Sequence, residues 1–137
     1  MAYKLIDHTA DIGFEVISGS ERELFADAVL AMFGLIADLR GVQAADQRNL
    51  TVEGMDPTDL LINFLREVLY LFNGEGFLLK EVAVTELSDI RIVATVSGEN
   101  YDPDRHTIKT ELKAVTYHQA YVRKIDGIWK AQVIFDV

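Results

Sequence analysis

The chain has 137 residues, half of them apolar, which is enough for one domain with a sizeable core. It contains no cysteine, which excludes a disulfide framework, a thiolate zinc site and a cysteine nucleophile. Its net charge is −9 and it has no run of lysines or arginines, so we expect a poor stand-alone nucleic-acid binder that reaches RNA only indirectly, through a basic partner.

The first part of the chain predicts two short strands and a helix. Tyr3–Ile6 and Phe14–Ile17 have the composition and alternation of strands. Ser20 and Glu23 have the spacing of a capping box, in which the serine caps the helix start and the glutamate reaches back. An apolar stripe at helical spacing follows, formed by Leu24, Ala28, Val29, Met32, Phe33, Ile36 and Leu39. We therefore expect an amphipathic helix that ends before Gly41.

A short strand at Asn49–Glu53 precedes a second predicted helix. Asp56 followed by Pro57 is typical of a helix start, with proline in the first turn. The apolar stripe of this helix consists of Leu60, Leu61, Phe64, Leu65, Val68, Leu69 and Phe72. The Asn73-Gly74 pair is expected to end the helix by supplying a left-handed residue.

The rest of the chain predicts strands and turns. The expected strands are Phe77–Leu87, Asp89–Ser97, Thr107–Val115, Ala120–Ile125 and Ile128–Val137. Asp126-Gly127 is the strongest hairpin signal in the chain. The pattern lacks the regular strand–helix alternation of a doubly wound fold. We therefore predict an α+β fold over residues 1–137, in which two amphipathic helices pack on a largely antiparallel or mixed β-sheet in a single domain.

Several common classes of protein find no support in this sequence. It has no phosphate-binding glycine-rich loop, no Gly-x-Ser-x-Gly elbow and no His-Glu-x-x-His helix. It has no apolar signal segment, and its apolar runs are far shorter than a membrane span. We expect a soluble, cytoplasmic protein without membrane contact. Its oligomeric state is left open.

Polar residues near both ends of the chain are candidates for a metal site. The segment Asp7-His8-Thr9-Ala10-Asp11 places two carboxylates and an imidazole within five residues. The chain closes on Asp136 and Val137 after an apolar, strand-like run. If the two ends meet, Asp11, Asp136 and the terminal carboxylate of Val137 could hold a hard cation, because Ca²⁺ and Mg²⁺ prefer oxygen ligands.

Both polar segments also have ordinary structural interpretations. Asp and Thr side chains in the opening segment could cap their own backbone amides, and spacing alone favours that interpretation. The closing residues could simply be exposed. A third group, formed by Lys113, His118, Arg123 and Lys124, could serve acid–base or phosphate chemistry, but a solvated strand face explains it more simply.

Three segments together resemble the archease family. They are Asp7-His8-Thr9-Ala10-Asp11-Ile12-Gly13, Leu112-Lys113-Ala114-Val115-Thr116-Tyr117-His118, and Trp129 through Asp136-Val137. The resemblance covers the whole chain, and it implies a small α+β protein that activates an RtcB-type RNA ligase in tRNA splicing and RNA repair. Such a protein is not itself the ligase, and promotes the GTP- and metal-dependent guanylylation and multiple turnover of its partner.

The resemblance also implies a metal site and activating residues. The cation is calcium, with magnesium or manganese as alternatives, and the ligands carried over are Asp11, Asp136 and Val137. Lys113 is implied to matter for activation, while the roles of His8 and His118 stay open.

Two other functions compete with the activator. One is a general chaperone or a modulator of a tRNA-modifying enzyme. The other is a stand-alone metal-dependent phosphohydrolase.

Overall fold

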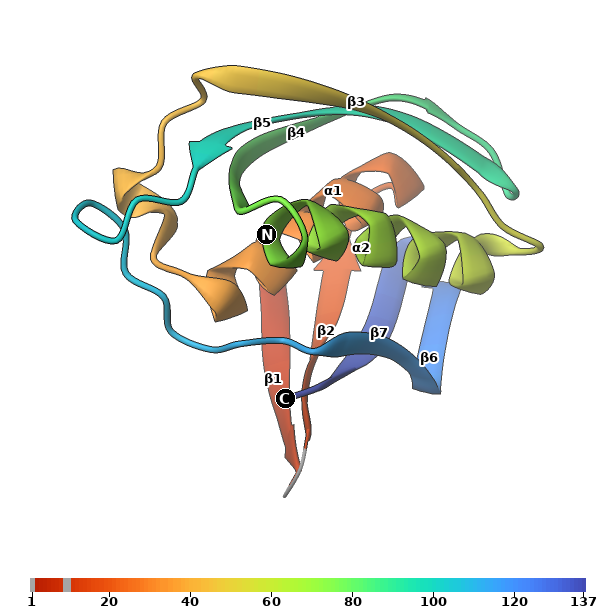
Figure 1. Ribbon diagram of the computed structural model, residues 1–137. Coiled ribbons are helices and arrows are strands. Elements are labelled where there is room, and N and C mark those ends of the chain that lie inside the picture. Colours follow the sequence, from red (N-terminus) through yellow and green to blue (C-terminus); the bar gives the residue numbers. More distant parts are fainter. Residues whose placement is uncertain (1, 9–10) are drawn as a thin grey trace.

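The computed structural model describes residues 2–8 and 11–137, which form two antiparallel sheets with two helices between them (Figure 1). The four-stranded sheet has the order β1-β2-β7-β6, and the three-stranded sheet has the order β3-β5-β4. The strands are β1 (Ala2–His8), β2 (Asp11–Ser18), β3 (Asp46–Glu53), β4 (Phe77–Leu87), β5 (Arg91–Asn100), β6 (Ala114–Ile125) and β7 (Ile128–Asp136). The predicted α+β class is confirmed, with two sheets in place of one.

Helix α1 (Glu21–Ile36) begins at the predicted cap, where the Ser20 hydroxyl accepts a hydrogen bond of 3.1 Å from the amide of Glu23. It ends at Ile36, and a short 3-10 helix follows at Leu39–Gly41. The helix packs against β4 on one side and β2 on the other. Because both sheets cover it, its buried side chains extend beyond a single stripe; they are Leu24, Phe25, Ala28, Val29, Ala31, Met32, Phe33 and Ile36.

Helix α2 (Pro57–Asn73) is also capped as predicted, since the Asp56 carboxylate accepts a hydrogen bond of 2.8 Å from the Asp59 amide. The predicted left-handed end is wrong for Gly74, which has φ of −93°. A Cβ at Gly74 would lie 2.5 Å from the ring of Tyr70, an exposed side chain that can move aside, so the contact does not require glycine. The left-handed residue is Gly76, with φ of 71°.

The predicted strand at Thr107–Val115 is wrong for most of its length. Only an isolated bridge between Ala37 and Ile108 forms there, and β6 begins at Ala114. The segment crosses from one sheet to the other beneath the helices (Figure 1). Its amides bond to other partners, such as the Ile36 carbonyl, which accepts from the amide of Lys109 at 2.7 Å. The apolar alternation is therefore that of a half-buried crossing segment rather than of a paired strand.

Strand alternation gives the four-stranded sheet an inner face and an outer face. Phe14 and Phe135 point inward to the helices, with ring centroids 5.3 Å apart. We call the opposite side of this sheet the outer face, and define it by Glu15, Gln132 and Tyr121, which are register neighbours across β2, β7 and β6. The Tyr121 hydroxyl donates to Glu15 at 2.9 Å across this face.

Candidate functional site

The two ends of the chain meet in the four-stranded sheet. In the register of β2 and β7, Asp11 is the direct partner of Asp136. On either side, His8 of β1 pairs with Asp11, and Ala114 of β6 pairs with Asp136. The condition on which the predicted metal site depended, that the chain ends be adjacent, is therefore met by the strand order. For His8, only this backbone pairing lies within the described part, and Thr9 and Ala10 lie outside it.

Both carboxylates lie on the same side of the sheet. Asp11 and Asp136 alternate with the inward-facing Ile12 and Phe135, so they share the outer face. Two like charges directly opposite each other in a sheet destabilise it. Asp136 is exposed and Asp11 is half-buried. The fold thus holds two acidic side chains together at some cost, which a bound cation would offset.

One carboxylate oxygen of Asp11, Oδ1, is buried. Among the described residues, its Oδ1 has no hydrogen bond. A buried polar atom in this state costs about 1–3 kcal/mol unless a ligand satisfies it. A hard cation coordinated by carboxylate oxygens fits this arrangement. Among the side chains that the structure describes, no three His, Asp or Glu residues gather as a metal cluster.

Lys113 lies next to this pair through its backbone. Its amide donates a hydrogen bond of 2.8 Å to the carbonyl oxygen of Asp136. Its exposed side chain helps to line a pocket of about 330 Å³ between α2 and the start of β6. The residues that line this pocket are Arg66, Leu69, Tyr70, Asn73, Lys113, Ala114 and Val115. The backbone of Lys113 therefore meets the acidic pair, while its side chain faces the pocket beside α2.

His118 lies apart from the acidic pair in the strand register. It is exposed, in a bulge of β6 where the register shifts between Thr116 and Tyr121. Its amide donates a hydrogen bond of 3.3 Å to the Thr116 hydroxyl. The structure therefore does not align His118 with Asp11.

The bulge is anchored to α2 by side chains that the sequence did not single out. Tyr117 donates a hydrogen bond to the Asp59 carboxylate, which lowers the pKa of Asp59 and raises that of Tyr117. The guanidinium of Arg66 lies 4.8 Å from the centre of the Tyr117 ring and donates to the Val115 carbonyl. These contacts position β6, and with it the segment that includes Lys113. No local sequence signal links residues so far apart in the chain.

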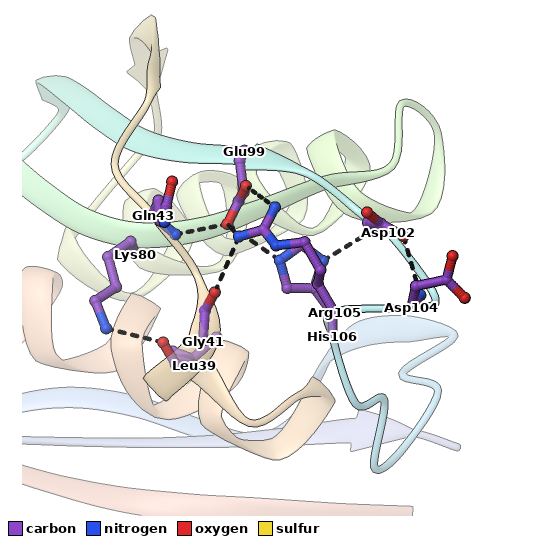
Figure 2. A network of polar contacts seen from close by, with 9 residues as sticks. All are labelled: Leu39, Gly41, Gln43, Lys80, Glu99, Asp102, Asp104, Arg105 and His106. Atoms are coloured by element: carbon purple, nitrogen blue, oxygen red, sulfur yellow. Dashed lines mark hydrogen bonds and ion pairs between the residues drawn. The ribbon is translucent and has the colours of Figure 1, made fainter.

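A second polar cluster surrounds Glu99 on the opposite sheet (Figure 2). The buried Glu99 carboxylate accepts hydrogen bonds from the Arg105 guanidinium at 2.7 and 3.0 Å and from the backbone amide of Gln43 at 2.7 Å. Nε2 of His106 lies 3.1 Å from the same carboxylate, and its Nδ1 accepts from the Asp102 amide. Both ring nitrogens are therefore engaged, with the proton on Nε2. The cluster holds two turns against the sheet and offers no free base for catalysis.

The Glu99 cluster predicts a pH-dependent contribution to stability. The Arg105 guanidinium, followed by the Gln43 amide, lowers the pKa of Glu99 from its ordinary value of 4.5 to about 2. A lowered pKa stabilises the fold above the ordinary value, and this contribution is lost as the pH falls toward 2. We expect Glu99→Gln to be less stable than the unaltered protein at pH 7, with a difference that shrinks between pH 4.5 and pH 2. Urea unfolding of both proteins across this range measures the difference, and a gap independent of pH would contradict the assignment.

No helix in the described part of the chain is both long and apolar enough to cross a membrane.

Comparisons with known proteins agree with one another over the whole length of the chain. Residues 3–137 match the model of the archease protein family (MTH1598/TM1083). The chain is 38% identical to the protein archease of Methanosarcina mazei, over 98% of this chain and 95% of that one. It is 36% identical to the protein archease of Methanopyrus kandleri, with both chains fully covered.

Two solved structures resemble this fold. The solution structure of protein 1598 from Methanobacterium thermoautotrophicum superposes with a TM-score of 0.84 at 34% identity, covering 98% of each chain. The crystal structure of an archease from Thermotoga maritima, described as a possible chaperone, superposes with a TM-score of 0.66 at 21% identity. That match covers 98% of this chain and 96% of the other.

Proposed function

The chain belongs to the archease family, and on that premise we propose that it is an accessory protein that activates an RtcB-type RNA ligase. In this proposal the ligase performs the GTP- and metal-dependent guanylylation and joins the RNA ends. The present protein promotes guanylylation and multiple turnover. The observation that supports an acidic activating site is the direct pairing of Asp11 with Asp136, together with the buried Oδ1 of Asp11, which has no hydrogen-bond partner among the described residues.

The proposed site holds a divalent cation, with calcium as the first candidate. Asp11, Asp136 and Val137 would be its protein ligands. The pair of facing carboxylates supports this assignment, as does Oδ1 of Asp11, which has no partner in the part of the chain that the structure describes, because a hard cation would satisfy both. When bound, the cation would supply positive charge that can neutralise phosphate oxygens. Without it, Asp11 and Asp136 would repel each other across the sheet.

Two further features support docking on a ligase. The net charge of −9 is complementary to the basic surface that an RNA enzyme needs, and complementary charge speeds encounter. The exposed side chain of Lys113, which lines the pocket beside α2, would contact a phosphate or a carboxylate of the partner. The hydrogen bond from the backbone amide of Lys113 to the Asp136 carbonyl holds the Lys113 backbone in place. Replacing the Lys113 side chain leaves that hydrogen bond intact.

The proposal is tested with a purified RtcB-type ligase, with and without this protein. We expect faster single-turnover guanylylation and sustained multiple-turnover ligation when the protein is present. We expect Lys113→Gln to lose most of this effect, while Lys109→Gln, a matched change at another exposed lysine, keeps it. An active ligase that shows no acceleration would rule the proposal out.

The competing functions are tested by the same preparation. Turnover of phosphoesters by the protein alone, without any ligase, would favour the phosphohydrolase. Suppression of aggregation of unrelated unfolded proteins, with no effect on the ligase, would favour the chaperone role that is suggested for the Thermotoga maritima archease.

A further inference from the structure

The pocket of about 330 Å³ that contains Lys113 lies where α2 meets the segment that leads into β6 (Figure 1). One wall is a single face of α2, because its lining residues recur every three or four positions along the helix. They are Arg66, Leu69, Tyr70 and Asn73. The other wall is formed by residues 113–115. The lining therefore combines apolar surface with two cations, and the described residues that form it include no aspartate or glutamate.

Side-chain hydrogen bonds fix the two walls of this pocket relative to each other. The side-chain amide of Asn73 donates to the Leu112 carbonyl at 2.9 Å. The guanidinium of Arg66 donates to the Val115 carbonyl at 3.1 and 3.2 Å. The backbone on either side of Lys113 and Ala114 is thus tied to α2. A pocket with walls held in this way binds a partner without the entropic cost of ordering them.

Two exposed tyrosines lie next to Arg66. Tyr70 follows it by one turn of α2 and is 59% exposed. Tyr117 is 48% exposed, and the centre of its ring lies 4.8 Å from the Arg66 guanidinium. Tyrosine and arginine are among the residue types that contribute most to binding energy in protein interfaces. This combination beside a partly apolar pocket is typical of a surface that docks another protein.

The charge around the pocket indicates what the occupant carries. Neither Arg66 nor Lys113 belongs to the four ion pairs among the described residues. The Asp59 carboxylate acts on Arg66 from the side of Tyr117, but it already accepts hydrogen bonds from the Tyr117 hydroxyl and from the Met55 amide. A protein with a net charge of −9 therefore presents positive charge at this place. Its complement is a carboxylate next to an apolar side chain.

We propose that this pocket docks a segment of the ligase that carries an apolar side chain beside a carboxylate. The apolar side chain would enter between α2 and β6 against the ring of Tyr70, and the carboxylate would contact Lys113 and Arg66. This inference rests on the proposed function and names the surface through which that function acts. The Lys113 amide is bonded to the Asp136 carbonyl at 2.8 Å, so a segment in the pocket would lie beside the acidic pair. The pocket would hold the ligase, and the acidic pair would act on it.

The test separates docking from activation. Ligase guanylylation is followed at increasing concentrations of the unaltered protein, of Tyr70→Gln and of Tyr3→Gln, a matched change at an exposed tyrosine of β1. We expect Tyr70→Gln to raise the concentration for half-maximal activation about tenfold and to keep the maximal rate, because only a docking contact is lost. Tyr3→Gln should behave as the unaltered protein does. Since both side chains are exposed, both variants should keep the thermal midpoint.

The outcomes distinguish this inference from the proposed function. An unchanged half-maximal concentration in Tyr70→Gln, or an equal rise in Tyr3→Gln, would overturn the docking pocket while activation itself stands. A lower maximal rate at saturating Tyr70→Gln would also overturn it, because the residue would then act in activation rather than in docking. No activation by the unaltered protein would overturn the proposed function, and this inference with it.

A charged variant at the same position tests the carboxylate of the partner. Tyr70→Glu matches Tyr70→Gln in size but places a negative charge one turn from Arg66. By titration calorimetry with the ligase alone, without RNA or GTP, we expect Tyr70→Glu to bind about tenfold more weakly than Tyr70→Gln, because like charges repel. Equal affinities would overturn the assigned carboxylate. An effect of Tyr70 that requires RNA would place nucleic acid in the pocket and overturn the proposal.

Discussion

Replacing Asp11 with asparagine is expected to abolish activation of an RtcB-type ligase without unfolding the protein. The change removes one of two carboxylates that face each other across β2 and β7, and with it a principal ligand of the proposed cation. In the presence of a chelator, the variant should be at least as stable as the unaltered protein, because the repulsion between Asp11 and Asp136 is gone. Lost activity combined with retained stability separates a role in metal binding from a role in folding.

Calcium-dependent stability measures the site without any ligase. If the folded state alone binds the ion, calcium at a hundredfold excess over its Kd adds about 2.7 kcal/mol to the free energy of unfolding. For a chain of this size, the thermal midpoint should then rise by about 8 °C. Asp11→Asn and Asp136→Asn should both lose this shift. Asp104→Asn, a matched change at an exposed turn residue, should keep the shift and the activation; a calcium shift that persists in Asp11→Asn would contradict the proposed ligands.

Replacing Gly98 with alanine is expected to cause the largest loss of stability among single methyl additions in this chain. A Cβ at Gly98 would lie 1.9 Å from the backbone oxygen of Leu78. That oxygen belongs to β4, which pairs with β5 and has a register shift just beyond, between Leu79 and Glu81. Because backbone cannot move aside as a flexible side chain can, the strands must separate locally. We expect a loss of about 3 kcal/mol or more in urea unfolding.

Gly34 provides the matched control for this prediction. It lies in the interior of α1, and a Cβ there meets no atom within 4 Å. Gly34→Ala should therefore stabilise the protein by about 0.5–1 kcal/mol, since alanine loses less backbone freedom than glycine in a helix. If the free energy of unfolding falls in Gly98→Ala and rises in Gly34→Ala, the space around each Cβ, rather than the added methyl group itself, decides the effect. Similar effects at both positions would contradict this account.

Local signals in the sequence predicted most of the individual elements. Both helices begin at the predicted caps, Ser20 and Asp56, because capping depends on residues within one turn. The predicted turn at Asp126-Gly127 is observed, with positive φ at both residues. The strand expected at Thr107–Val115 failed because alternation reports which side chains are buried, and does not report whether a neighbouring strand is present to pair with the backbone.

The candidate site was only partly visible in the sequence. Asp11 and Asp136 stood out as acids at the two ends of the chain, but the sequence could not place them together. The anchor formed by Tyr117 and Asp59 gave no signal, because its members belong to different elements. Arg123 was noted as part of a solvated strand face, and its position opposite Lys130 emerges only from the register of the hairpin.

The sequence by itself determined the two helices, their caps, the hairpin turn and the apolar residues available for a core. These depend on interactions between residues close in the chain, whose geometry is set by backbone conformation and side-chain spacing. Only the tertiary structure decided that β2 pairs with β7, that the helices lie between two sheets, and that Asp11 faces Asp136. Those choices depend on how distant apolar faces pack together, and a strand pattern alone does not specify its partner or its register.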